Sequence, residues 1–217
     1  LTKHGVAAKT AWTAEETETL VPAPDLGEKE MRAIEAYNQG VQALAPKEKA
    51  EAYALAISLL PDFYEAWFNR GAVAAATQDF DAAETAYRKA AALRPGAVEV
   101  QRNLGRVYLA RNQFAEAAQC FEQARTLAPD APQSYNDLGE AYRQLKRYED
   151  AIKAFTKAIE LKPDYAAAHY NAGLACAASN QNQQAKVHFE RFLALEPRAE
   201  NAAQVQAYLE DMKKKQP

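Results

Sequence analysis

Residues 66–95 read AWFNRGAVAAATQDFDAAETAYRKAAALRP, and this stretch returns in altered form along most of the chain. Prolines stand at 61, 95, 129, 163 and 197 and glycines at 71, 105, 139 and 173, so both columns repeat every 34 residues. Three further columns keep that period: alanine from 83, an aromatic residue from 87 and leucine from 93. Five columns with one period predict a chain built from a repeated structural unit.

Each repeat is predicted to fold as two helices joined by a short turn. The second helix has apolar residues at intervals of three or four, the pattern of a helix with one buried face, at Ala83, Tyr87, Ala90 and Leu93. The first helix is expected from about residue 63 to 76, with a polar turn at residues 77–79. Proline ends the second helix, because it cannot donate a backbone hydrogen bond and restricts the residue before it.

The glycine column lies inside the first helix, where glycine costs about 1 kcal/mol relative to alanine. Gly71 and its equivalents therefore need a compensating role. Two closely packed helices need a residue without a side chain where their backbones come nearest. We interpret the glycine column as a packing feature of the helix pair.

The quoted stretch resembles the tetratricopeptide repeat (TPR), because it carries that family's tryptophan, glycine, alanine, aromatic, alanine and proline in order. The resemblance implies an all-α fold, a right-handed α-α superhelix (TPR solenoid) of antiparallel helix pairs. Four full repeats are expected at about residues 64–97, 98–131, 132–165 and 166–199.

Both flanks of the four repeats are predicted to extend the array, giving a TPR domain over residues 28–217. Upstream, AYNQG ends at Gly40, but Pro61 follows three residues too early, which indicates a shortened first repeat at about residues 30–60. Downstream, an apolar stripe predicts a capping helix at about residues 199–214, which would cover the last repeat.

Residues 1–27 lie outside the repeat and form an acidic, proline-containing leader. The stretch VPAPDLG opposes regular structure, so we expect an extended tether. Thr13 and Glu16 have the spacing of a capping box, which allows a short helix before Pro22. The compartment is unknown from the sequence: the expectation is a soluble chain, either cytoplasmic or exported with a leader removed.

Composition argues against several kinds of partner. The formal net charge of -3 gives no general attraction to nucleic acid. No apolar run approaches the ~18 residues of a membrane span. Cys120 and Cys176 are too far apart in sequence for a metal-binding motif. We expect no nucleic-acid partner and no direct membrane span.

The sequence also lacks the residue groupings of an enzyme. The histidines are His4, His169 and His188, and no serine or cysteine nucleophile is placed beside any of them. No glycine-rich phosphate loop or metal-ligand cluster is present. We therefore predict no catalytic residues, no metal site and no cofactor.

Two residues before each glycine the chain carries an amide or a carboxylate, at Asn38, Asn69, Asn103, Asp137 and Asn171. The resemblance to TPR proteins implies that these side chains line a concave groove formed by the first helices. An amide both donates and accepts, so it can pair with the backbone of a bound peptide of any sequence. The alternative is a local hydrogen bond to a neighbouring helix.

The preceding column reads Tyr37, Phe68, Arg102, Asn136 and Tyr170. Its aromatic members can bind apolar side chains or complete the packing, and we favour packing for Phe68 and binding for Tyr170. Arg102, Arg106 and Arg143 are expected on the same surface, where they would bind a carboxylate or pair with nearby acids. The family's clamp for chaperone tails has no matching set of residues here.

These features predict a non-enzymatic scaffold for protein–protein interaction, with a protein segment or an extended peptide as partner in the concave groove. Two alternatives remain open from the sequence. One is structural self-assembly into a homo-oligomer, and the other is an accessory domain of a larger enzyme or complex.

Overall fold

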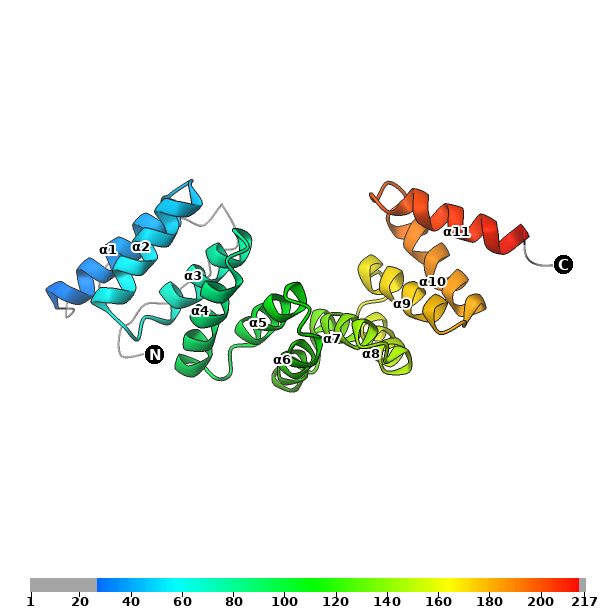
Figure 1. Cartoon of the computed structure of the whole chain (residues 1–217), viewed down its shortest axis with the longest axis horizontal. Helices are drawn as coiled ribbons and strands as arrows, with labels where there is room; N and C mark the ends of the chain where they lie inside the picture. Colours follow the sequence, from blue (N-terminus) through cyan, green and yellow to red (C-terminus); the bar gives the residue numbers. More distant parts are fainter. Residues whose placement is uncertain (1–26, 215–217) are drawn as a thin grey trace. The chain divides into compact units, whose positions relative to one another are not determined.

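The computed structural model describes residues 27–214, which contain eleven α-helices and no β-strand (Figure 1). The helices are α1 (Glu28–Gln42), α2 (Pro46–Leu59), α3 (Tyr64–Ala76), α4 (Phe80–Leu93), α5 (Val98–Ala110), α6 (Phe114–Leu127), α7 (Pro132–Gln144), α8 (Tyr148–Leu161), α9 (Ala166–Ala178), α10 (Asn182–Leu195) and α11 (Ala202–Lys214). The predicted all-α fold of antiparallel helix pairs is confirmed. The expected tether and short helix of the leader lie outside the described residues.

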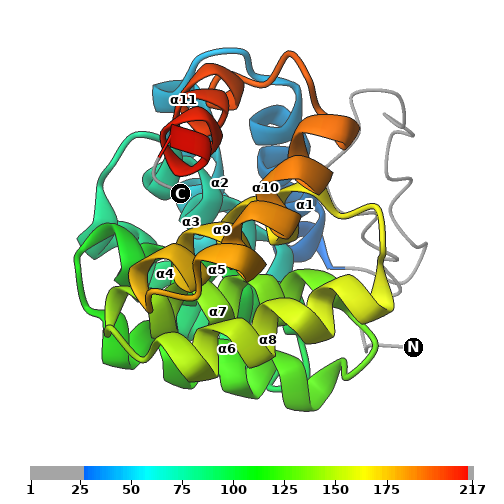
Figure 2. The ribbon, with the colours of Figure 1, turned by 90° about the vertical axis from the view of Figure 1, so that its right-hand side faces the viewer.

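The helices form two compact units. The first ends at Arg111 and contains α1 to α5, and the second begins at Asn112 and contains α6 to α11. Within each unit consecutive helices pack against each other, and α11 packs against α10 (Figures 1 and 2). Each unit therefore has its own helix-to-helix contacts.

The turns between helices depend on a left-handed residue that the sequence patterns do not reveal. Gln78, Asn112, Lys146 and Asn180 have φ between 59° and 61°, and they follow one another at the repeat period. Asparagine tolerates this conformation better than most residues, but glutamine and lysine have no such preference. The 34-residue spacing of these four positions shows that repeat geometry, more than residue type, imposes the turn.

Each helical glycine for which the contact is described faces an aromatic ring of the second helix. A Cβ atom added at Gly139 would lie 2.6 Å from the ring of Phe155, and one at Gly71 would lie 2.8 Å from that of Tyr87. Gly173 faces Phe189 and Gly40 faces Tyr53 in the same way. The closest approach at the glycine is thus to a side-chain ring, which corrects the expectation that the two backbones meet there.

We predict that Gly139→Ala lowers the stability of the protein by about 1–3 kcal/mol, because the new methyl group overlaps the Phe155 ring and forces the helix pair apart. Thermal or urea unfolding would measure the loss.

Gly96→Ala is the matched control, since a Cβ there meets nothing within 4 Å. Equal stability of the Gly139→Ala variant and the unchanged protein would contradict the packing role of the glycine column.

The last repeat is closed by α11, whose buried side chains include Val205 and Leu209. Tyr208 meets Phe189 of α10 with ring centroids 5.2 Å apart. Phe192 stands where the earlier repeats have alanine, and it is buried in the same cluster. The larger residue supplies apolar surface at the end of the array, where no further repeat follows in the described structure.

Deletion of residues 199–217 is expected to uncover Phe189 and Phe192 and to promote aggregation, because an uncapped repeat exposes its apolar flank. Static light scattering and a thermal melt would test this. An unchanged melting temperature and a monodisperse solution would contradict the capping role of α11.

Candidate functional site

The first helix of a repeat is tied to the loop before it by one recurrent hydrogen bond. Trp67 Nε1 donates to the carbonyl oxygen of Pro61 at 2.7 Å, and the Tyr135 hydroxyl donates to the carbonyl oxygen of Pro129 at 3.0 Å. His169 Nε2 lies 3.1 Å from the carbonyl oxygen of Pro163 in the third example. Tryptophan, tyrosine and histidine differ in shape, but each donates a hydrogen bond to the carbonyl oxygen of the proline that precedes its helix. This bond fixes the first helices, which carry the predicted binding residues.

In the first unit, two asparagines of the predicted ladder, Asn69 and Asn103, bond to buried tyrosines. Asn69 is 7% exposed, and its Nδ2 donates to the Tyr37 hydroxyl at 3.0 Å. It also bonds to Tyr53, whose pKa is raised to about 12 by burial. Asn103 bonds in the same manner to Tyr87, whose pKa burial also raises to about 12. These amides therefore provide hydrogen-bond partners for tyrosine hydroxyl groups that are buried between the helices.

The second unit differs because phenylalanine replaces the tyrosine. Phe121 and Phe155 stand at the positions of Tyr53 and Tyr87, and they have no hydroxyl group for the amide or carboxylate of the next repeat. Asn171 on α9 instead donates from Nδ2 to Oδ1 of Asn136 on α7 at 3.1 Å. Its side chain is only partly buried. We call Asn136, Glu140, Arg143, Tyr170 and Asn171 the α7–α9 face.

The aromatic residues of the predicted groove separate into two groups. Tyr37 is 3% exposed and Phe68 is 2% exposed, so both belong to the core of the first unit and offer little surface to a ligand. Tyr170 is partly buried on α9, where its ring centroid lies 5.1 Å from that of Phe192. Packing on Phe192 fixes the Tyr170 ring and leaves part of it accessible. Asn38, the first member of the ladder, is also partly exposed.

The three arginines lie in different units. Arg102 and Arg106 are four residues apart on α5 in the first unit, whereas Arg143 is on α7 in the second. Arg143 forms a bidentate pair with Glu140, with Nε–Oε2 at 2.8 Å and Nη2–Oε1 at 2.7 Å. That hydrogen bonding raises the pKa of Arg143. Asp137 is buried. The Arg143 contact is thus the internal pairing that was the alternative to an anion site.

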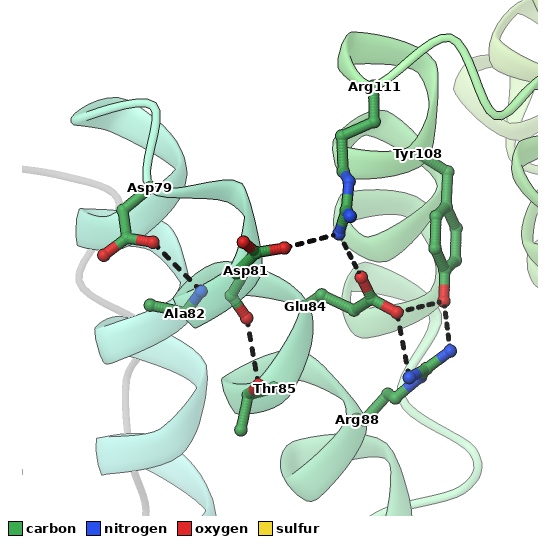
Figure 3. Close-up of polar contacts among 8 residues, drawn as sticks. All are labelled: Asp79, Asp81, Ala82, Glu84, Thr85, Arg88, Tyr108 and Arg111. Carbon is green, nitrogen blue, oxygen red and sulfur yellow. Dashed lines mark hydrogen bonds and ion pairs between the residues drawn. The ribbon is translucent and has the colours of Figure 1, made fainter.

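A polar network that the sequence analysis did not anticipate joins α5 to α4 (Figure 3). The Tyr108 hydroxyl accepts from Arg88 at 2.8 Å and donates to Glu84 at 3.1 Å. Glu84 also pairs with Arg88 and with Arg111, and Arg111 reaches Asp81 at 3.0 Å. Since Arg102, Asn103 and Arg106 are on α5, this network helps to hold them in place. Its members come from two repeats, so spacing within one helix gives no sign of it.

Glu84→Gln is expected to destabilise the first unit by about 1–2 kcal/mol, because it leaves the partly buried guanidinium of Arg111 with a weaker acceptor. Chemical unfolding at low and high salt would measure the change, and the loss should persist in salt since Glu84 is mostly buried. Lys47→Gln, which removes an exposed pair with Glu51, is the matched control. Equal effects of the two substitutions would contradict this role of Glu84.

Residues 27–214 present no group of three or more metal-ligating side chains. No helix among them is long and apolar enough to cross a membrane. Cys176 Sγ lies 3.8 Å from Gln184 Oε1, and burial raises the pKa of its thiol, which disfavours the reactive thiolate. His169 and His188 contact each other.

Repeated helix pairs with a recurrent tie between repeats define a helical repeat protein. Models of the tetratricopeptide repeat match residues 62–130, 102–166 and 147–185, which together cover more than half of the chain. The chain belongs to the tetratricopeptide repeat family. A search of curated proteins finds no match.

Several solved structures share the fold. A MamA structure (41-end) from Desulfovibrio magneticus RS-1 has a TM-score of 0.73 and 24% identity, covering 80% of this chain and 98% of that one. YrrB, described as a TPR protein with an unusual peptide-binding site, has a TM-score of 0.65 and 19% identity, covering 75% and 84%. The first TPR of Spaghetti (RPAP3), bound to the HSP90 peptide SRMEEVD, has a TM-score of 0.51 and 25% identity, covering 54% and 90%.

Proposed function

We propose that the chain is a non-enzymatic scaffold that binds an extended peptide, or an extended segment of another protein, across the α7–α9 face. The observation that carries this proposal is the hydrogen bond between Asn171 and Asn136. It uses one N–H of Asn171 and one carbonyl oxygen of Asn136. The carbonyl oxygen of Asn171 keeps its accepting capacity among the described residues, and its second N–H remains available.

An extended backbone matches these groups because it presents N–H and C=O groups in alternation. Asn171 can accept from one peptide N–H and donate to a peptide carbonyl at the same time. Its bond to Asn136 restricts the amide before binding, which reduces the entropy lost when a ligand is held. Asn69 lacks this availability, because it is buried and its Nδ2 already donates to the Tyr37 hydroxyl.

The side chains around the amide suit an interface. Tyr170 precedes Asn171 on α9 and is held by Phe192, so it offers a rigid aromatic surface at low entropic cost. The Glu140–Arg143 pair lies one and two turns beyond Asn136 on α7 and supplies both signs of charge. These groups favour a partner with mixed polar and apolar side chains over a purely anionic one.

The comparisons support the class of function. The YrrB structure is described as having a peptide-binding site, and the RPAP3 structure contains a bound peptide. The family's clamp for chaperone tails has no counterpart in this sequence. The proposed ligand is therefore an extended segment within the partner's chain and not its tail. No catalytic role is assigned to any residue.

The experiment begins with site-specific photocrosslinking in a lysate of the source organism. A photoreactive amino acid at Leu174, one turn beyond Tyr170 on α9, should capture a partner, and the same group at Val187 on α10 should not. Val187 is 64% exposed and serves as a surface control. Peptides from the captured segment are then used for calorimetry.

With such a peptide, Asn171→Ala is expected to weaken binding by about 1 kcal/mol and to leave the melting temperature nearly unchanged. Asn103→Ala should show the reverse, because it leaves the Tyr87 hydroxyl without its partner in the helix stack. Full affinity of the Asn171→Ala variant would contradict the proposed site. A molecular mass that rises with concentration, without crosslinking at Leu174, would favour self-assembly instead.

A further inference from the structure

Two histidines meet between the helices of the last repeat. His169 on α9 and His188 on α10 approach through their Nδ1 atoms, which lie 3.3 Å apart. The ring centroids are 5.6 Å apart, and the planes are inclined by 44°. His169 is buried and His188 is partly buried. Two unprotonated nitrogens would repel each other at this distance, so a proton must lie between them.

The position of that proton follows from the other nitrogen of His169. Nε2 faces the carbonyl oxygen of Pro163 at 3.1 Å, and a carbonyl can only accept. Nε2 therefore carries hydrogen, as the donors of Trp67 and Tyr135 do at the equivalent positions. In the neutral ring this leaves Nδ1 of His169 as an acceptor. His188 must then donate from its own Nδ1.

We propose that the His169–His188 pair is an acid-responsive latch, which joins α9 to α10 when the pair is neutral or carries one extra proton and opens when both rings are charged. The first extra proton can bind Nε2 of His188, and the contact between the rings remains. The second must bind Nδ1 of His169. Two N–H groups and two positive charges then face each other, which breaks the contact.

The environment opposes charging of the pair. Burial lowers the pKa of His188 below its ordinary value, and the neighbouring His169 lowers it further. The ion pairs on the packed helices α7, α8 and α10 connect residues of the same helix or its cap: Glu140–Arg143, Arg147–Asp150, Lys157–Glu160 and Lys186–Glu190. Other titratable groups on the packed elements include Asp137 on α7, Tyr148, Glu149 and Lys153 on α8, Lys162, Asp164 and Tyr165 before α9, Tyr170 and Cys176 on α9, Arg191 and Glu196 on α10 and at its end, and Tyr208, Glu210 and Asp211 on α11.

The sign of the pH dependence follows from the lowered pKa. The unfolded chain protonates His188 at about pH 6.5, whereas the folded chain does so only at lower pH. The contribution of neutral His188 to stability is therefore complete above about pH 6.5 and is lost as the pH falls through its folded pKa. The contact between the rings opens below that pH, when the second proton binds.

The latch is confined to the last repeat. The positions that correspond to His188 in the earlier repeats hold Ala86, Cys120 and Ala154, which cannot form such a pair. The same helix α10 carries Phe189 and Phe192, against which α11 is closed. Opening of the latch thus loosens the end of the array and leaves the other helix pairs without an equivalent change. This inference does not depend on peptide binding.

The test compares hydrogen exchange of α9 and α10 at pH 7.5 and pH 5.0, corrected for intrinsic rates, with α3 and α4 of the same molecule as reference. We expect the protection of α9 and α10 to fall more than that of the reference at pH 5.0, because charging of the pair is opposed in the folded chain and not in the unfolded chain.

Three variants isolate the pair. His169→Tyr keeps a donor for Pro163, as Tyr135 has in its repeat, and His188→Gln keeps a donor for His169. Both should lose the additional acid sensitivity of α9 and α10, whereas His4→Gln should retain it. If either His169→Tyr or His188→Gln fails to fold, the acid sensitivity of the other variant still tests the proposal. An acid effect of wild-type size in a folded variant of either histidine would overturn the proposal.

Discussion

The structure depends on an aromatic ring of the second helix that lies where a glycine of the first helix has no side chain. Tyr87 shows the full arrangement, because its ring covers Gly71 and its hydroxyl bonds to Asn103 of the next repeat. One side chain thus connects three helices. The helix penalty of glycine, about 1 kcal/mol, is offset by burial of most of an aromatic ring, which contributes several times as much.

The contact between ring and glycine sets the geometry within a repeat, and the bond from the first helix to the preceding proline carbonyl sets the geometry between repeats. The proline ends one helix, and its carbonyl oxygen then accepts a hydrogen bond that orients the next helix. Trp67, Tyr135 and His169 satisfy this requirement with different side chains. A repeat family can therefore vary the residue at this position, provided that a donor of suitable reach is kept.

The all-α fold of helix pairs was predictable from sequence, since the periodic columns mark helix pairs directly. Gly71, Ala83, Tyr87 and Pro95 belong to columns whose spacing alone defines the repeat. The candidate site was less accessible, because the role of each asparagine depends on a residue in the preceding repeat. The tyrosine or phenylalanine at positions 53, 87, 121 and 155 was visible, but its relevance appears only when two repeats are stacked. The Glu84 network and the His169–His188 contact likewise join side chains from different helices.

The change from tyrosine at positions 53 and 87 to phenylalanine at positions 121 and 155 has a consequence for how such arrays diversify. Removing a single oxygen atom from a buried ring changes the hydrogen bonding of an amide on the neighbouring repeat, while the shape of the core is nearly conserved. A lineage can thus acquire or lose a surface amide through one nucleotide change at a site that never contacts a ligand. In a designed array, the same substitution would allow the available amides to be chosen repeat by repeat without redesign of the exposed residues.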